Sequence, residues 1–417
     1  MVRHIYTSID IGTDTIKVVV TEIHKGKLNL LAASSTKSKG IKKGLVTDVN
    51  DASASLKSAI NEVEEMLGIK IKKVLISVPS YFAEFTKIEG KIKINNDDSI
   101  ITGYDIRDVL EVAIKNNSFP KEIVSVIPID FKIDDQTGIK DPKGLMGSVL
   151  SVRAIACLTP KKNIYSVITL ADSIGLEVMD IMLNGIGDVN AFKNAETESK
   201  LGAIINIGCE TTSISIYNKG IVIKNSIIGM GGKNIDNDIS YMYKIEPSEA
   251  TKIKEKFALA HKKNANINEF YTIKNLDNKK INQLEVTEIV MSRIEEILGL
   301  AKKEINSLAN RKMDYIIITG GTSNIKDFIT VAEEIFDKNI AIGNINIIGL
   351  RNNKYSTAIG NIIYYINKLK LLGNNISFIS DTELNRLSLN GLVNVSSESM
   401  LGKVFGYFFG ETNEEEI

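Results

Sequence analysis

The feature that most constrains this chain is a unit of strand, glycine turn and strand that occurs twice. The first copy spans residues 5–34 and turns at Gly12, and the second spans residues 201–223 and turns at Gly208. In each copy a second turn leads into a third strand, which completes a meander. Two like meanders, one near the start of each half of the chain, predict two α/β lobes of like architecture.

The segment between the two meanders predicts helices and an insertion. Apolar residues at helical spacing predict helices over 52–67, 104–116 and 162–174. From about 82 to 159, amphipathic strands of alternating polarity surround the middle helix. We therefore expect a small subdomain inserted into the first lobe. A final helix over 357–371 is expected to close the second lobe.

These patterns divide the chain into successive parts. We call the body of the first lobe subdomain 1A and its insertion subdomain 1C, and we call the body of the second lobe subdomain 2A and its charged, helical extension subdomain 2B. A stretch rich in Asn, Ser and Asp then predicts a flexible linker before an apolar tail. The predicted boundaries are 1–81 and 160–197 for 1A, 82–159 for 1C, 198–230 and 308–372 for 2A, 231–307 for 2B, 373–398 for the linker and 399–417 for the tail.

Charge and cysteine content limit the classes of partner and compartment. Lys and Arg together number 51, as do Asp and Glu, so no overall field attracts nucleic acid, and we expect no nucleic-acid partner. Two cysteines cannot build a disulfide framework, which favours a reducing compartment. The sequence shows no signal-peptide pattern and no run of about 18 apolar residues. We expect a cytoplasmic protein.

The first glycine turn has the chemistry of a phosphate site. Gly12 lets the backbone approach a phosphate closely, and successive N–H groups there can form an anion nest. Thr13 adds a hydroxyl group and Lys17 a positive charge. Asp10, at the end of a buried strand, is placed to hold the waters of a bound Mg²⁺. A plain β-turn explains this segment equally well when it is taken alone.

Four motifs in register resemble the actin/Hsp70/sugar-kinase superfamily. Residues 10–17 resemble its first phosphate loop, 206–212 its second, and 318–321 followed by Ile325 its adenosine motif. Residues 252–256 resemble the helix whose Lys–Glu pair faces the nucleoside. The resemblance implies that ATP and Mg²⁺ bind in a cleft between the two lobes. The implied ligand residues are Asp10 (also for Mg²⁺, through water), Gly12, Thr13, Lys17, Gly208, Thr211, Gly232, Lys254, Glu255, Gly320 and Gly321.

Within that superfamily, the chain resembles the FtsA family of bacterial cell-division proteins over nearly its whole length. The resemblance is carried by residues 39–46, 138–147 and 355–360. The insertion at about 82–159 occupies the position of the FtsA-specific subdomain, whereas actin and MreB carry a different insertion earlier in the first lobe. The resemblance therefore implies a two-lobed actin-like ATPase fold with an FtsA-type insertion.

The second loop departs from the family pattern Asp-Ile-Gly-Gly-Gly-Thr-Thr-Asp. Asn206 and Ser213 replace the two acidic residues, and Cys209 and Glu210 replace two glycines. The amide removes a charge that would help to orient Mg²⁺, and Glu210 adds a charge that would repel a triphosphate. Asn184 and Asn206 are the only candidates for catalysis, and no carboxylate is evident around Asn184. We expect ATP binding with slow hydrolysis at most, or a lobe that has kept the fold and lost the nucleotide.

The tail predicts a short amphipathic helix. Ser399 is a suitable N-cap, and a stripe of apolar residues follows at helical spacing. Such a helix beyond a polar linker favours binding to a membrane interface. The alternative is that the tail folds back onto the second lobe. The residues expected to enter the membrane are Met400, Leu401, Val404, Phe405, Phe408 and Phe409.

The resemblance also implies a function. It implies an ATP-binding protein that polymerises and tethers the tubulin-like protein FtsZ to the inner face of the cell membrane at the division site. The surface that contacts FtsZ in this family lies on subdomain 2B, and the tail binds lipid. Two other classes stay open: a membrane-associated adaptor of the type-IV pilus kind, and a small-molecule kinase, which would need a catalytic Asp in the first lobe.

Overall fold

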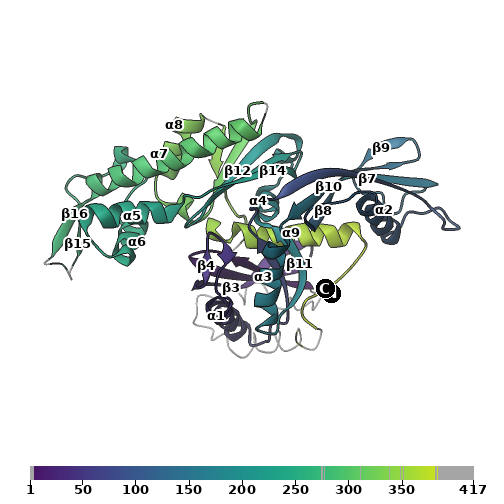
Figure 1. The fold of residues 1–417 in the computed structure, drawn as a ribbon, viewed down its shortest axis with the longest axis horizontal. Helices are drawn as coiled ribbons and strands as arrows, with labels where there is room; N and C mark the ends of the chain where they lie inside the picture. The colour runs from purple at the N-terminus through teal and green to yellow at the C-terminus, as the bar shows by residue number, and fades with distance from the viewer. Residues whose placement is uncertain are drawn as a thin grey trace, which may run out of the picture.

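Two lobes, each built on a mixed sheet, make up the body of the protein (Figure 1). The structure is a computed structural model, and it describes residues 4–383 except 274, 275, 277, 310, 338, 348, 351, 381 and 382. Within those residues the first five-stranded sheet has the order β11-β6-β1-β2-β3 and the second has the order β14-β13-β12-β17-β18. In both sheets two parallel strands extend the three antiparallel strands of a meander. The predicted pair of like α/β lobes is confirmed.

The inner strands of both sheets are largely apolar and buried, whereas the strands at the sheet edges are mostly half-buried. The first sheet contains β1 (His4–Ile11), β2 (Thr15–His24), β3 (Lys27–Lys37), β6 (Lys73–Val78) and β11 (Glu177–Leu183). The second contains β12 (Leu201–Ile207), β13 (Thr212–Asn218), β14 (Ile221–Ile228), β17 (Tyr315–Thr319) and β18 (Ile340–Ile342). A short hairpin of β4 (Ile41–Lys42) and β5 (Leu45–Val46) follows the first meander.

Two helices cover the outer part of the first lobe. Helix α1 (Val49–Leu67) begins after Asp48, whose side chain accepts a hydrogen bond from the backbone of the first turn, and ends at Gly68 in the left-handed conformation. Its buried apolar face packs on β2 and β3. Helix α3 (Lys161–Asp172) packs beside it. Both helices lie within a few residues of the predicted ranges.

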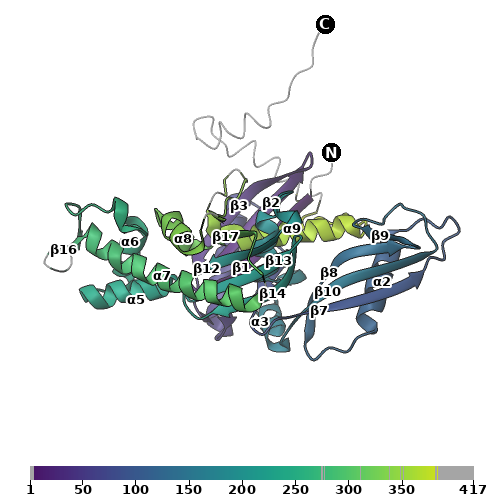
Figure 2. The same ribbon diagram turned by 90° about the horizontal axis from the view of Figure 1, so that it is seen from above.

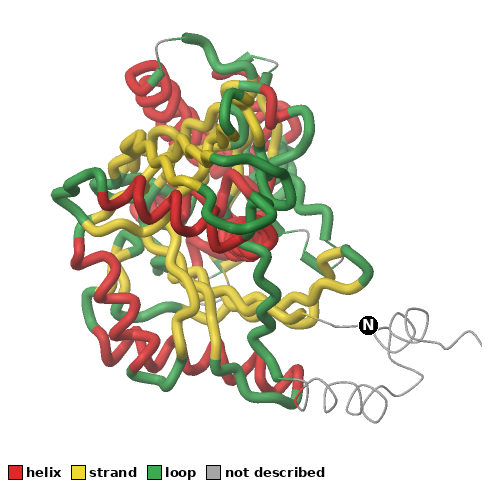
Figure 3. The backbone as a smooth tube through the Cα atoms, turned by 90° about the vertical axis from the view of Figure 1, so that its right-hand side faces the viewer, coloured by secondary structure: helices red, strands yellow, loops and turns green. Residues whose placement is uncertain are grey.

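Helices α4 (Asn184–Phe192) and α9 (Ser356–Leu371) lie between the two lobes (Figure 1), and Figure 3 shows helices between two groups of strands. They approach so closely that a Cβ on Gly360 would lie 1.6 Å from the carbonyl oxygen of Gly187. The prediction for α9 was wrong in its packing, because α9 lies against β1, β2 and β6 of the first sheet instead of closing the second lobe. Conversely, α4 contacts β12, β13 and β14. Periodicity marks an apolar face but does not say which sheet covers it.

The insertion is a separate layer of sheet and helix beside the first lobe (Figure 2). Its sheet has the order β7-β10-β8-β9, with α2 on one face and a hydrophobic core of its own. The close contact of α2 with β7 needs Gly90, because a Cβ there would lie 2.3 Å from the carbonyl oxygen of Val109. Its elements are β7 (Glu84–Lys93), α2 (Gly103–Lys115), β8 (Glu122–Ile133), β9 (Gln136–Ile139) and β10 (Val149–Thr159).

The extension of the second lobe projects away from the insertion, at the opposite end of the molecule (Figure 1). The long helix α7 packs on β13 and β14 and reaches out to the small hairpin of β15 and β16. Its elements are α5 (Gly232–Tyr243), α6 (Pro247–Lys256), β15 (Phe270–Ile273), β16 (Lys279–Asn282) and α7 (Gln283–Leu308), and α8 (Phe328–Phe336) follows in the lobe itself.

The start of the predicted linker packs on the first lobe. The backbone N–H of Phe378 donates to the carbonyl oxygen of Ile5 at 2.9 Å, and its buried ring lies against Tyr6 and Tyr365. The prediction of a flexible linker over 373–398 was therefore wrong for its first residues, because two apolar side chains among polar ones suffice to dock an extended segment. The predicted tail, 399–417, lies outside the described residues. Among those residues, no helix has the length and hydrophobicity needed to cross a membrane.

Candidate functional site: the cleft between the lobes

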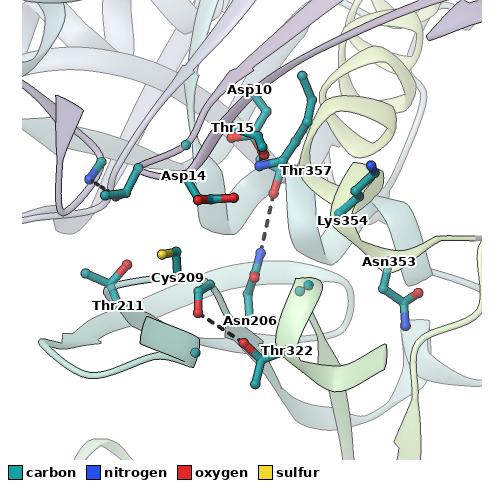
Figure 4. Close-up of a pocket in the computed structure, with 18 of the residues that line it drawn as sticks. Asp10, Asp14, Thr15, Asn206, Cys209, Thr211, Thr322, Asn353, Lys354 and Thr357 are labelled. Atoms are coloured by element: carbon teal, nitrogen blue, oxygen red, sulfur yellow. Dashed lines mark hydrogen bonds and ion pairs between the residues drawn. The ribbon is translucent and has the colours of Figure 1, made fainter. Parts of the chain in front are cut away.

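A cavity of about 600 Å³ lies between the two lobes, and residues of both lobes line it (Figure 4). The turn between β1 and β2 meets the turn between β12 and β13 there, because the two meanders face each other. Every residue predicted to bind nucleotide lines this cavity, and so do Asn184 and Asn206. These residues are Asp10, Gly12, Thr13, Lys17, Gly208, Thr211, Gly232, Lys254, Glu255, Gly320 and Gly321.

The first loop is a tight turn whose charged groups are already paired. A Cβ on Gly12 would lie 2.7 Å from the carbonyl oxygen of Thr15, so only glycine fits without distortion. Lys17 Nζ donates to Asp10 Oδ2 at 2.9 Å, and both side chains are largely buried. The hydroxyl of Thr13 accepts a hydrogen bond from the backbone N–H of Gly44 at 2.8 Å, which joins the loop to the β4–β5 hairpin.

The cavity suits a Mg²⁺ ion that arrives with a phosphate ligand. No group of three or more His, Cys, Asp or Glu side chains among the described residues could hold a metal ion by itself. Asp10 lines the cavity and is 7% exposed. Magnesium keeps several waters and is commonly bound by one or two carboxylates together with substrate phosphates. The donor set around Asp10 fits that mode and does not form a closed protein cage.

The second loop packs on the beginning of α5. The backbone N–H of Gly232 donates to the carbonyl oxygen of Gly208 at 2.8 Å, and a Cβ on Gly231 would lie 2.5 Å from that oxygen. The first turn of α5 therefore lies directly against the loop. The backbone N–H of Lys233 likewise donates to the carbonyl oxygen of Cys209 at 2.8 Å, so the first N–H groups of α5 hold the loop, and what the helix offers an anion in the cleft is the positive end of its dipole.

Glu210 does not line the cavity, contrary to the expected repulsion of a triphosphate. Its Oε1 pairs with Lys233 Nζ at 2.6 Å, and its Oε2 accepts from the backbone N–H of Lys43 at 2.9 Å. Burial alone would raise the pKa of Glu210, but the hydrogen bonds from Lys233 and Lys43 outweigh it and hold the pKa below its usual value. The carboxylate is thus neutralised, and it joins the second lobe to the first.

Lys254 and Glu255, the two residues expected to face the nucleoside, both line the cavity. Lys254 Nζ also pairs with Asp236 of α5 at 2.8 Å. Gly320 has φ +94°, a conformation that favours glycine, at the end of β17. No pattern in the sequence connected Asp236 with Lys254.

Cys209 stays a neutral thiol at neutral pH. Burial first, and then the charge of Asp14, raise the pKa of Cys209 to about 11. Burial contributes more to this shift than the nearby carboxylates do.

A buried carboxylate that the sequence motifs did not indicate lies behind Asn206, outside the lining of the cavity. Asp188 lies one helical turn beyond Asn184 on α4 and is 1% exposed. It accepts hydrogen bonds from Asn206 Nδ2 and from the hydroxyl of Thr357 at 2.7 Å. Burial raises the pKa of Asp188 to about 6, against these hydrogen bonds. The signal was available, because residues i and i+4 share a helix face. The expectation of no carboxylate around Asn184 was wrong.

Comparisons with known proteins agree with this architecture. Residues 203–360 match the family model "Cell division protein FtsA", and residues 83–157 match "SHS2 domain inserted in FTSA". The chain is 28% identical over 382 residues to the cell division protein FtsA of Bacillus subtilis (strain 168), which covers 90% of this chain and 87% of that protein. It is 29% identical over 386 residues to FtsA of Buchnera aphidicola subsp. Baizongia pistaciae, with 87% and 90% covered.

Solved structures show the same fold at low sequence identity. The type IV pilus biogenesis complex PilM–PilN gives a TM-score of 0.58 at 12% identity and covers 89% of this chain and 99% of that chain. MreB5 of Spiroplasma citri bound to ADP gives a TM-score of 0.54 at 14% identity, with 88% and 98% covered. The fold is thus the two-lobed actin-like fold, with the inserted domain that the second family model matches. Because both FtsA models match in their expected places and curated FtsA proteins align over most of the chain, the protein belongs to the FtsA family of cell-division proteins.

Proposed function

We propose that this protein binds Mg·ATP in the cleft and works as an actin-like cell-division protein. One observation carries the proposal: two phosphate loops and an adenosine motif, far apart in sequence, converge on one cavity of about 600 Å³. That volume lies within the range of small-ligand sites. MreB5 of Spiroplasma citri, which shares the fold, is bound to ADP in one structure and to AMPPNP in another.

The residues of the cleft suggest binding more than rapid hydrolysis. Gly12 and Gly208 let the backbone approach phosphates, Lys17 supplies positive charge, and Asp10 would hold the waters of Mg²⁺, whose charge would offset that of the phosphates. Lys254 and Glu255 would face the nucleoside. Asn184 and Asn206 are amides, which cannot take a proton from an attacking water. Slow turnover is therefore expected.

We further infer that the protein polymerises and tethers FtsZ to the inner face of the membrane. Subdomain 2B, 231–307, projects from the body and exposes two adjacent apolar side chains on α5: Tyr241 is 83% exposed and Met242 is 63% exposed. Exposed apolar groups of this kind often mark protein contacts. The tail, 399–417, would bind lipid at the division site, and lobe–lobe contacts between copies would form the filament.

The two other classes are less well supported. A small-molecule kinase needs a carboxylate in the first lobe that faces the substrate hydroxyl, but Asp188 does not line the cavity and its oxygens face Asn206 and Thr357. A pilus-type adaptor has the fold in its favour, since a chain of the PilM–PilN type IV pilus biogenesis complex has a similar structure. The FtsA models match the chain itself, which favours division.

A pull-down with FtsZ of the same organism tests the function. Wild-type protein with Mg·ATP should retain FtsZ, and Tyr241→Ser with Met242→Ser should weaken retention while leaving nucleotide binding intact. Tyr104→Ser is a matched control, because Tyr104 is 75% exposed but lies on subdomain 1C. If the wild type retains no FtsZ while it binds Mg·ATP, the tethering function is wrong and an adaptor of another assembly gains.

A further inference from the structure

Asn206 occupies the position where the family's second loop has an aspartate, and its orientation is fixed by its neighbours. Its Nδ2 lies 3.0 Å and 2.9 Å from the two carboxylate oxygens of Asp188. A carboxylate accepts hydrogen bonds and does not donate them. The atom that faces Asp188 must therefore be the NH₂ group of the amide. A second contact, 3.4 Å from Nδ2 to the hydroxyl oxygen of Thr357, agrees with this assignment (Figure 4).

The other end of the amide faces the cavity. Asn206 and Gly320 both line the cavity, and a Cβ on Gly320 would lie 2.5 Å from Asn206 Oδ1. The glycine therefore leaves room for this oxygen beside the ligand space. No described residue donates a hydrogen bond to Oδ1. The second loop thus presents an unused acceptor oxygen to the cavity, where an aspartate would present a carboxylate oxygen.

Asp188 is itself held rigidly. It lies on α4 at the crossing with α9, where Thr357 donates to its Oδ1 at 2.7 Å and Ser356 at 3.4 Å. Ser356 in turn accepts from Thr319 at the end of β17 at 3.1 Å. Elements of both lobes therefore hold the carboxylate against the end of β12. A fully buried carboxylate is costly to keep without a partner, and here its partner is a residue of the cleft.

We propose that Asp188 is a positioning residue for the cleft, which turns the amide of Asn206 so that its carbonyl oxygen faces the water shell of a nucleotide-bound Mg²⁺. This inference rests on the proposed binding of Mg·ATP. The waters around Mg²⁺ donate hydrogen bonds outward, so they need acceptors around them. With the opposite orientation, the amide would present NH₂ to these waters and lose the interaction. In the family pattern one aspartate supplies both the acceptor oxygen and the negative charge, whereas here Asn206 supplies the acceptor and Asp188 the charge.

An exchange of the two side chains tests the inference. The variants are Asp188→Asn, Asn206→Asp and the double exchange. For each folded variant, the affinity for ATP in EDTA and the affinity of the ATP complex for Mg²⁺ are measured separately. The control is Asp314→Asn, because Asp314 accepts a hydrogen bond from the backbone of Leu201 at the opposite end of β12. The control should match the wild type in both measurements.

In Asp188→Asn the side chain keeps one acceptor oxygen, toward which Thr357 and Ser356 donate, and it can turn its NH₂ group toward Asn206, so the orientation of Asn206 is no longer fixed. The affinity of this variant's ATP complex for Mg²⁺ should fall about tenfold or more, as is typical when a residue that orients a metal-binding group from behind is removed. ATP binding in EDTA should be unchanged, a separation that a merely structural role would not give. Asn206→Asp brings two carboxylates together and should lower the melting temperature. The double exchange should restore Mg²⁺ affinity, because the new amide can donate to the new carboxylate.

The outcomes separate this inference from the proposed function. If wild-type protein binds ATP with no effect of Mg²⁺, or binds no ATP, the proposed function fails and this inference fails with it. If the wild type shows the Mg²⁺ effect and Asp188→Asn keeps it in full, the inference alone is overturned. Should Asp188→Asn fail to fold, the double exchange decides, since it keeps one charge and one amide. A folded double variant that lacks the Mg²⁺ effect would also overturn it.

Discussion

Glu210 connects the two lobes at the mouth of the cleft, and its removal should speed nucleotide release. Its Oε2 accepts the backbone N–H of Lys43, from the β4–β5 hairpin of the first lobe, while its Oε1 pairs with Lys233 on α5 of the second. The next residue of that hairpin, Gly44, donates to Thr13 in the first phosphate loop. The hairpin thus contacts both loops, and Glu210 supplies its contact with the second. Opening the cleft would break this contact.

The expected change in the release rate follows from the free energies of the two contacts of Glu210. The side chain of Glu210 is 18% exposed, so its hydrogen bond from Lys43 belongs with bonds to charged groups, worth about 1.5 kcal/mol at the lower end of the range. Lys233 is 53% exposed, and a pair so open to solvent contributes about 0–1 kcal/mol. Because 1.4 kcal/mol corresponds to a factor of ten, Glu210→Ala should increase the rate constant for release of a fluorescent ADP analogue about tenfold.

Two further variants and a pH series sharpen the measurement by stopped-flow displacement with excess ATP. Glu210→Gln keeps an acceptor for Lys43 and should change release much less than Glu210→Ala does. Glu196→Ala removes an exposed pair with Lys200, four residues along the chain in the connection that leads into β12, and should have no effect. The folded pKa of Glu210 lies below its usual value. The stabilisation of the closed cleft by this carboxylate is therefore complete above about pH 4.3 and is lost as pH falls through the folded pKa. Release that is unchanged in Glu210→Ala would refute the reasoning.

Three other predictions concern the cleft, the helix crossing and the tail. Asp10→Ala and Gly12→Val should each abolish the rise in melting temperature caused by Mg·ATP, the first by removing the metal's partner and the second by filling the phosphate's space. Gly360→Ala should lower the free energy of unfolding, measured with denaturant, by on the order of 3 kcal/mol, because its Cβ would meet the backbone of Gly187. Gly299→Ala, at an open position of α7, should raise that free energy by about 1 kcal/mol. Phe405→Glu should release the protein from anionic vesicles and Lys403→Gln should not, because a large apolar side chain contributes roughly 1.5 kcal/mol or more and one basic residue about 1 kcal/mol.

The fold was largely predictable because its signals are local. The meanders at 5–34 and 201–223 each combine alternating or continuous apolar strands with glycine turns, and such patterns depend on neighbours in sequence. The partner of α9 was not predictable in the same way. Its packing on the first sheet depends on the close crossing at Gly187 and Gly360, and nothing in the periodicity of a helix identifies the surface it covers.

The same difference between local patterns and tertiary contacts explains which cleft residues were predicted and which were missed. Glycines and charged residues of the loops were found because backbone geometry near a phosphate demands particular residue types at short spacing. The partners of Lys254 and Asn206 were missed, because Asp236 and Asp188 come from other elements and meet them only in the folded chain. A motif in sequence gives the residues that touch a ligand, whereas the residues behind them are set by tertiary packing.

The two departures of the second loop therefore have a different meaning in the folded protein than in the motif. In the motif, Asn206 suggested a lost negative charge, but in the folded protein the carboxylate of Asp188 lies behind it. Glu210 suggested an added repulsion, but Lys233 neutralises it. Raising the pKa of a buried carboxylate from 3.8 to about 6 corresponds to a cost on the order of 3 kcal/mol at neutral pH. Compared with neutral pH, the protonated Asp188 therefore adds stability, which is complete below about pH 3.9 and is lost as pH rises through about 6. An asparagine at 188 would avoid the cost, so the aspartate is best explained by what it does for Asn206. Asp188→Asn should accordingly unfold at a higher temperature than the wild type at pH 7.5 while losing Mg²⁺ affinity, and a variant that loses both stability and affinity would mean that Asp188 serves the fold alone.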